Sequence, residues 1–210
     1  MLIAFVVLWW IIIIGTFNTV LRGRGYTYGG TPVRTGLFYG MSIVLTVLVF
    51  APMSFGWHFF NPLHALILAV LYVGISYGDL KITQRYPEKD RVWVWNSTRV
   101  KYADILFQQL VIFLFFVSIT FYCESILSQV ALFAVIFLIL HLPVFLVMPK
   151  TIAWVFFLAS VFAGVLFPLL FIFLPHLGPY ITIVLHILFY SALRILRHDS
   201  DVWAQFIEKD

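Results

Sequence analysis

Five polar side chains lie within otherwise apolar stretches of the sequence and are of types that take part in acid–base chemistry. Asp104, Gln108 and Gln109 lie in "DILFQQLVIF", and His141 and His186 lie in two later apolar stretches. A carboxylate or a neutral imidazole can accept a proton from an attacking water, whereas an amide can only orient that water. Ionisable groups inside a membrane usually face a bundle interior or a water-filled space. The set therefore predicts a polar cavity inside a membrane protein.

The composition predicts that these residues lie on membrane-spanning helices. The chain has 210 residues, of which 63% are hydrophobic and 10% charged, and its mean hydropathy is +1.03. Apolar runs of about 20 residues are long enough to cross a bilayer as helices. Seven such runs are present, at about 2–20, 36–53, 62–77, 102–121, 128–148, 153–174 and 178–195. We predict an all-α polytopic bundle of about seven spans, forming one integral membrane domain over residues 1–210.

The basic residues predict how this bundle is oriented. All 13 Lys and Arg residues fall in the first, third and fifth loops, at the end of the seventh span or in the tail. Because cytoplasmic loops carry an excess of Lys and Arg, the N-terminus is expected outside and the C-terminus in the cytoplasm. The cell membrane, and for a bacterial chain the inner membrane, is the expected location.

Two polar segments on the cytoplasmic side are expected at the membrane surface. The tryptophans of "RVWVW", in the third loop, are typical of a short interfacial strand or helix. The tail, residues 197–210, spaces its apolar side chains at helical intervals and predicts an amphipathic helix.

The partners expected from the sequence are the lipid bilayer and other membrane-bound molecules. The net charge of +4 arises from basic residues in short loops, so no nucleic-acid partner is expected. No cofactor motif is present, and Cys123 is the single cysteine. A two-histidine, one-carboxylate metal set of His141, His186 and Asp104 is an alternative without any ligand-spacing signature, and no metal is predicted.

Helix geometry predicts that three of the polar residues share one depth. A helix rises about 1.5 Å per residue, which puts Gln108 roughly 9 Å, His141 roughly 10 Å and His186 roughly 13 Å from the cytoplasmic ends of their spans. Asp104 and Gln108 are four residues apart and therefore share a helix face. The alternative is that each polar residue bonds a neighbouring helix and only holds the bundle together.

The same residues resemble motifs of the CAAX-protease and bacteriocin-processing (CPBP, or Abi) family of intramembrane peptidases. That family carries Glu-Glu-x-x-x-Arg, then Phe-x-x-x-His, then His-x-x-x-Asn or Asp. The chain has "QQLVIF" (108–113), "FLILH" (137–141) and "HILFY" (186–190) in the same order. The resemblance implies a CPBP-like core at about 102–196, with Gln108 and Gln109 in place of the two catalytic glutamates. It also implies His141 and His186 as the two histidines, Phe113 in place of the arginine and Tyr190 in place of the Asn or Asp.

The resemblance implies two competing functions. A degenerate, non-catalytic peptidase homologue would bind a partner helix, a lipid or a prenylated peptide in a cytoplasm-facing cavity. An active intramembrane endopeptidase would instead use His141 and His186 as acid–base and oxyanion partners, with Asp104 as a displaced carboxylate. The loss of both glutamates favours the first, because a neutral amide cannot act as a base. A small-molecule transporter is a further alternative, although no internal repeat supports it.

Overall fold

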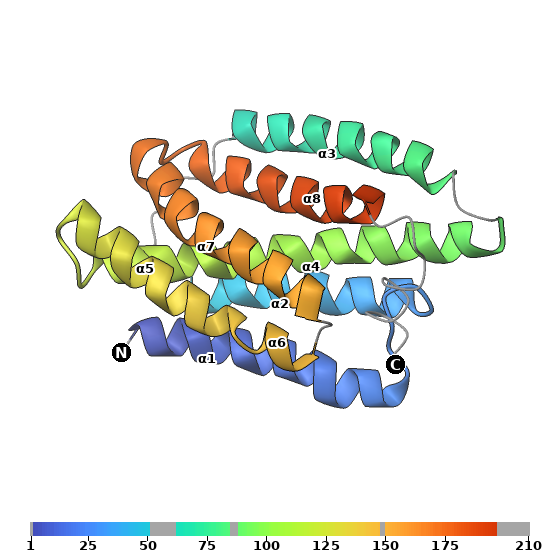
Figure 1. Cartoon of the computed structure of the whole chain (residues 1–210), viewed down its shortest axis with the longest axis horizontal. Coiled ribbons are helices and arrows are strands. Elements are labelled where there is room, and N and C mark those ends of the chain that lie inside the picture. The colour runs from blue at the N-terminus through green and yellow to red at the C-terminus, as the bar shows by residue number, and fades with distance from the viewer. Residues whose placement is uncertain (1, 51–61, 85–87, 148–149, 197–210) are drawn as a thin grey trace.

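The fold is a bundle of helices in a computed structural model that describes residues 2–50, 62–84, 88–147 and 150–196. The predicted amphipathic tail, 197–210, lies outside the described residues. In chain order the elements are α1 (Leu2–Gly15), the π-helix η1 (Thr16–Leu21), the 3-10 helix η2 (Arg22–Arg24), α2 (Pro32–Phe50), α3 (Pro62–Thr83), α4 (Glu88–Thr120), α5 (Ile126–His141), α6 (Val144–Val147), α7 (Lys150–Phe173) and α8 (Gly178–Leu196). The long helices lie side by side (Figure 1), and no strand occurs in the described residues, which confirms the all-α prediction for them.

Five helical segments are long and apolar enough to cross a membrane. They are Leu2–Arg24, Pro32–Phe50, Val94–Thr120, Ile126–Leu146 and Lys150–Phe173. The apolar part of α8, Gly178–Leu193, is shorter, and α3 is a 22-residue helix outside this group. The described part of the chain therefore has the character of an integral membrane protein, whereas the count of seven spans and their orientation stay predictions.

Helix α4 begins earlier than the sequence suggested. It runs for 33 residues from Glu88, so that "RVWVW" belongs to the same continuous helix as the fourth predicted span. Of the two alternatives for this segment the helix is confirmed and the strand is wrong. Neither Gly nor Pro interrupts residues 88–120, and Arg99 lies 5.4 Å from the ring of Trp95, one turn earlier.

Helix α4 is also the central helix of the bundle. It packs against α1, α2, α3, α5 and α8, and in Figure 1 it lies between α8 and α2. Its buried side chains contribute to two hydrophobic clusters. The larger one joins α4 to α1, α2, α5 and α7, and the smaller one joins Tyr102 and Ile105 of α4 to Ile187 of α8. Polar residues on α4 are therefore surrounded by other helices.

Helix α2 has polar side chains on its buried face and apolar side chains on its exposed face, as a helix in lipid does. Its buried face carries Thr35, Ser42 and Thr46, whereas Leu37 and Leu48 are among its exposed side chains. The buried hydroxyls bond backbone carbonyls; for example, Thr46 Oγ1 donates to the carbonyl of Ser42 at 2.6 Å. Small hydroxylated residues on the inner face allow neighbouring helices to approach closely.

Helices α5 and α7 approach each other closely at a glycine. A Cβ placed on Gly164 would lie 3.3 Å from Cα of Ala134. Two small residues, Gly164 and Ala134, thus face each other, as is typical of helix pairs in membranes. Pro168 lies one turn later inside α7 and cannot donate a backbone hydrogen bond to the carbonyl of Gly164.

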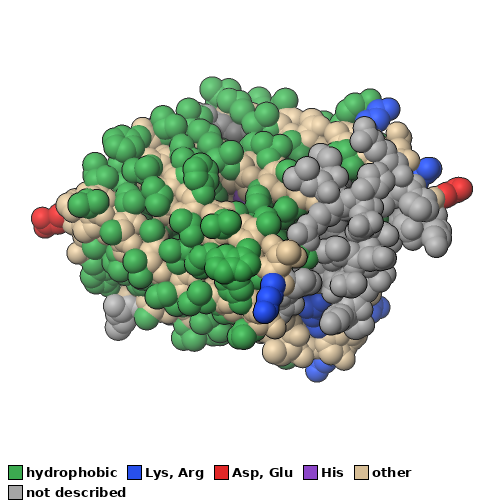
Figure 2. Space-filling view, in the orientation of Figure 1, with side chains coloured by type: hydrophobic (Ala, Val, Ile, Leu, Met, Phe, Trp, Pro, Cys, Tyr) green, Lys and Arg blue, Asp and Glu red, His purple; other side chains and the backbone are tan. Residues whose placement is uncertain are grey.

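Charged and apolar side chains separate along the bundle. In the space-filling view of Figure 2 the Lys and Arg side chains gather toward the end at which α4 begins, and hydrophobic side chains cover most of the rest of the drawn face. This distribution is what a bilayer requires of the surface of a membrane protein.

Candidate functional site

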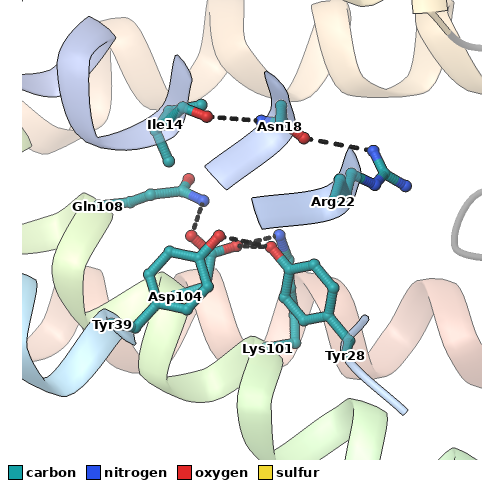
Figure 3. A network of polar contacts seen from close by, with 8 residues as sticks. All are labelled: Ile14, Asn18, Arg22, Tyr28, Tyr39, Lys101, Asp104 and Gln108. Atoms are coloured by element: carbon teal, nitrogen blue, oxygen red, sulfur yellow. Dashed lines mark hydrogen bonds and ion pairs between the residues drawn. The ribbon is translucent and has the colours of Figure 1, made fainter. Parts of the chain in front are cut away.

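Asp104 is the centre of a buried polar cluster on α4. Its side chain is 2% exposed. Gln108 Nε2 donates to Oδ1 at 2.8 Å, Lys101 Nζ donates to Oδ2 at 2.5 Å, and Tyr28 OH donates to Oδ2 at 3.2 Å (Figure 3). Asp104 and Gln108 therefore lie on one helix face, as their spacing predicts, and are joined by a hydrogen bond. The protein itself supplies the partners that a buried carboxylate needs.

Two tyrosines extend this cluster away from α4. The hydroxyl oxygens of Tyr28 and Tyr39 are 2.8 Å apart. Because Tyr28 gives its single hydrogen to Asp104, Tyr39 must be the donor in the bond between the two tyrosines. Burial raises the pKa of Tyr28 well above its usual value of 10.0, and the negative charge of Asp104 raises this pKa further. Tyr28 is therefore a protonated donor at neutral pH.

The ammonium group of Lys101 contacts two aromatic rings as well as the Asp104 carboxylate. Its Nζ lies 5.6 Å from the ring centre of Tyr28 and 4.7 Å from that of Tyr190. Both rings can attract the ammonium group through their negative faces. Lys101 thus connects the first loop, through Tyr28, with α8, through Tyr190.

Gln109 has a different hydrogen-bond partner from its neighbour Gln108. Gln109 Nε2 lies 2.7 Å from His186 Nδ1, and the His186 ring stacks on Tyr190 with ring centres 5.3 Å apart. Gln109 is 3% exposed, and its Oε1 is buried without a hydrogen-bond partner in the described part of the chain. If the amide is turned over, its NH₂ group is the one left without a partner. A buried amide with one unused group is unusual and often marks a functional position.

His141 is attached to its own helix. Its Nδ1 lies 2.7 Å from the carbonyl oxygen of Phe137, and its ring packs at an angle of 45° against that of Phe137, with ring centres 4.3 Å apart. A carbonyl can only accept, so Nδ1 carries the hydrogen and Nε2 has the free lone pair. His141 lies near enough to His186 to interact with it electrostatically. No hydrogen bond of the described residues joins it to the amides.

The structure thus distributes the five predicted site residues over three arrangements. Asp104 and Gln108 form one, Gln109 and His186 form another, and His141 bonds its own backbone. Consecutive residues of a helix point about 100° apart, which explains why the two glutamines have different partners. Within the described residues no three His, Cys, Asp or Glu side chains are grouped to hold a metal, so the alternative metal set is not assembled.

Two further positions at which the resembled motifs differ, Phe113 and Tyr190, also have definite surroundings. Phe113 is buried and packs edge-on against Phe171, with ring centres 5.4 Å apart. Tyr190 lies between His186 and Lys101. Phe113 therefore completes the hydrophobic core, whereas Tyr190 is part of the polar cluster.

Sequence reasoning missed three members of the cluster around Asp104. Lys101 was assigned to the third loop, although its spacing of three residues from Asp104 would have placed both on one helix face once α4 was extended. Tyr28 and Tyr39 come from the first loop and α2, 76 residues before Asp104 in the case of Tyr28. No local pattern indicates these long-range contacts.

A second buried carboxylate also lay outside the predicted set. Asp79, on α3, is 1% exposed and accepts from Ser191 Oγ of α8 at 3.5 Å. The Ser191 Oγ is also 3.1 Å from the hydroxyl of Tyr102 on α4. The predicted third span ended at 77, which placed Asp79 in a loop, whereas α3 continues to Thr83. This carboxylate helps to hold α3, α4 and α8 together.

The π-helix η1 positions an aromatic residue beside the tyrosines. Phe17 is buried, and its ring centre lies 5.3 Å from those of both Tyr28 and Tyr39. The side chains of Asn18 and Thr19 donate to the carbonyls of Ile14 and Gly15, at 2.9 and 2.7 Å. Wide turns of this kind interrupt ordinary helical bonding and occur frequently at functional sites.

Comparison of the chain with protein-family models, curated proteins and solved structures gives no match.

Proposed function

We propose that the chain is a seven-span protein of the cell membrane, the bacterial inner membrane in a bacterium, with its N-terminus outside and its C-terminus in the cytoplasm. The apolar helical segments and the gathering of basic side chains toward one end support this topology. The third and seventh spans would be α3 and α8.

The native cysteine offers a direct test of this topology. Cys123 lies between α4 and α5, which the proposal puts outside. A membrane-impermeant thiol reagent should label it in intact spheroplasts. A Gln84→Cys change in a Cys123→Ser background, at the other end of α3, should be labelled only after the membrane is opened. The reverse labelling pattern would overturn the orientation.

Within this topology, we propose a non-catalytic relative of the CPBP peptidases that binds a membrane-anchored peptide. The engagement of Asp104 carries this proposal. The carboxylate already accepts from Lys101, Gln108 and Tyr28, and its side chain is 2% exposed, so it offers an attacking water at most one of its about four acceptor positions. Gln108, at the position of the first catalytic glutamate, is an amide that donates to Asp104 and cannot be a base.

The Gln109–His186 pair supports a role in binding. Its unused amide group is a hydrogen-bonding position that the backbone of a bound peptide can satisfy. The peptide would approach from the cytoplasmic half of the bundle, where the predicted cavity would lie, and a prenyl or other lipid anchor would remain in the bilayer.

A binding and cleavage assay on the purified protein in nanodiscs tests the proposal. We expect a fluorescent prenylated peptide to bind and to remain uncleaved. Gln109→Leu should weaken binding, whereas Gln129→Leu, which removes an amide bonded to the Cys123 carbonyl near the other end of the bundle, should not. Equal binding by both variants would exclude the Gln109–His186 pair as the site.

An active endopeptidase is the second candidate, favoured by one observation. The bond from His141 Nδ1 to the carbonyl of Phe137 leaves Nε2 with its lone pair, as a general base requires. Cleavage of the same peptide by the wild type, and its loss in both His141→Ala and His186→Ala, would establish this candidate and overturn the non-catalytic one.

A further inference from the structure

Three arginines lie around the connection between the first helix and α2. We define the basic corner as η2, the connecting residues 25–31 and the first turn of α2, with Arg22, Arg24 and Arg34 as its charged members. No Asp or Glu occurs before Asp79, so these arginines are the only charged side chains in the first 78 residues. The corner therefore carries three positive charges with no acidic neighbour along the chain.

The backbone of the basic corner is held by its own hydrogen bonds. Gly25 has φ of 79°, a left-handed conformation that ends the helical turn, and its N–H bonds the carbonyl of Arg22 at 2.9 Å. The carbonyl of Thr27 accepts from the hydroxyls of Thr31 and Thr35, at 3.1 and 3.0 Å. These bonds hold η2 and the start of α2 in a fixed relation, so the arginines extend from an ordered frame.

The basic corner is also fastened to α4. Tyr28, in the middle of the connection, donates to the buried Asp104. That carboxylate is already paired with Lys101, so its charge is neutralised beneath the corner. Arg24 and Arg34 are exposed on the outer side. Arg24 and Arg34 thus present positive charge on the exposed side of the corner.

A polar strip continues from the basic corner along the membrane-spanning part of the first helix. Arg22 Nη1 donates to Asn18 Oδ1 at 3.2 Å (Figure 3). Both Asn18 and Thr19 are exposed. Exposed amide and hydroxyl groups are costly against lipid tails, but they suit the glycerol and phosphate region of a bilayer.

Other basic residues at this end of the bundle are engaged differently. Lys81 lies 5.5 Å from the ring centre of Tyr77, and Arg99 lies 5.4 Å from that of Trp95, each four residues earlier on the same helix. Both side chains have an aromatic partner on their own helix. They provide a matched comparison of equal charge.

We propose that the basic corner binds a phosphate-bearing anion, through guanidinium groups that can each form paired hydrogen bonds with phosphate oxygens. The headgroup of an anionic phospholipid is one source and free inorganic phosphate is the other. This site is separate from the proposed peptide site and does not depend on it.

Binding of phosphatidylglycerol and of inorganic phosphate to the purified full chain in mild detergent tests the proposal. Native mass spectrometry gives the apparent Kd for each ligand. The test variant is Arg22→Gln/Arg24→Gln/Arg34→Gln, and the control is Lys81→Gln/Arg91→Gln/Arg99→Gln, which removes the same charge. Thermal unfolding of each variant checks that the bundle is intact. Each arginine near a lipid surface contributes about fivefold in binding, so the corner variant should lose at least roughly tenfold.

Each outcome decides the question. Weaker binding by the corner variant, with unchanged binding by the control variant, supports the site. If only phosphatidylglycerol binding is weakened, the ligand is a lipid headgroup. If inorganic phosphate binding is weakened equally, the ligand is soluble. Equal losses in both variants would show attraction by general surface charge and overturn the proposal. Unchanged binding in the corner variant would overturn it as well.

Discussion

Lys101 and Asp104 form a buried ion pair at the centre of the bundle. Lys101 Nζ lies 2.5 Å from Asp104 Oδ2, and the two side chains are 19% and 2% exposed. The pair joins the first loop through Tyr28 and lies beside α8 through Tyr190. Removing either charge leaves the other without its main partner in a poorly hydrated place.

The first prediction concerns this ion pair. Asp104→Asn or Lys101→Met should lower the free energy of unfolding by about 3–5 kcal/mol, because each leaves an uncompensated buried charge. The double variant Lys101→Met/Asp104→Asn should be less destabilised than the two single effects added together, because no uncompensated charge remains. Unfolding in detergent with increasing dodecyl sulfate measures all three, and a double variant that shows the sum of the single effects would contradict the pairing.

The second prediction separates the two glutamines. Gln108→Glu places a second carboxylate where the amide now donates to Asp104 at 2.8 Å, so like charges meet and a hydrogen bond is lost. We expect a loss of roughly 1–3 kcal/mol near neutral pH, diminishing on acidification as a carboxylate takes up a proton. Gln109→Glu places the new carboxylate against the His186 ring instead, where an imidazolium can pair with it, and should cost less. Thermal unfolding between mildly acidic and neutral pH distinguishes the two, and equal behaviour would contradict their separate environments.

The third prediction concerns the contact between α5 and α7. Gly164→Ala adds a methyl group 3.3 Å from Ala134 Cα and should destabilise the protein by about 1–3 kcal/mol through overpacking. Gly40→Ala, on α2, meets no atom within 4 Å and should be neutral or stabilising by roughly 0.5–1 kcal/mol, because alanine favours the helix. Unfolding curves of both variants give the comparison, and a stabilised Gly164→Ala variant would show that the helices are not in close contact there.

The fourth prediction follows from the raised pKa of Tyr28. Since the folded protein holds this proton more tightly than the unfolded chain, the stabilising contribution is complete below pH 10 and is lost as the pH rises toward the folded-state pKa. Wild-type stability should fall above pH 10 by up to about 1.4 kcal/mol per pH unit from this group. Tyr28→Phe should be less stable at neutral pH but lack this part of the alkaline loss. Parallel alkaline curves for the two proteins would contradict the role of Tyr28 as a donor.

Some contacts of the site were predictable because they are local. The bond between Asp104 and Gln108 follows from their spacing of four residues, and the connection of His141 to Phe137 also spans one helical turn. The start of α4 at Glu88 was not predicted, because a charged segment can be helical or irregular until its packing is known. Placing Lys101 in a loop hid its pairing with Asp104.

By itself the sequence predicted an all-helical, apolar chain and placed its basic residues in alternate loops. Hydrophobicity and charge can be read from each residue type alone. The helical rise of about 1.5 Å per residue then gives the expected depth of a residue from its position in a span. Only the tertiary structure decided which of these residues touch. The rotation of each helix about its axis determines that Gln109, and not Gln108, contacts His186. The packing of α2 and the first loop on α4 places Tyr28 within hydrogen-bond distance of Asp104. Those choices depend on how whole helix surfaces fit together, which spacing along one helix does not specify.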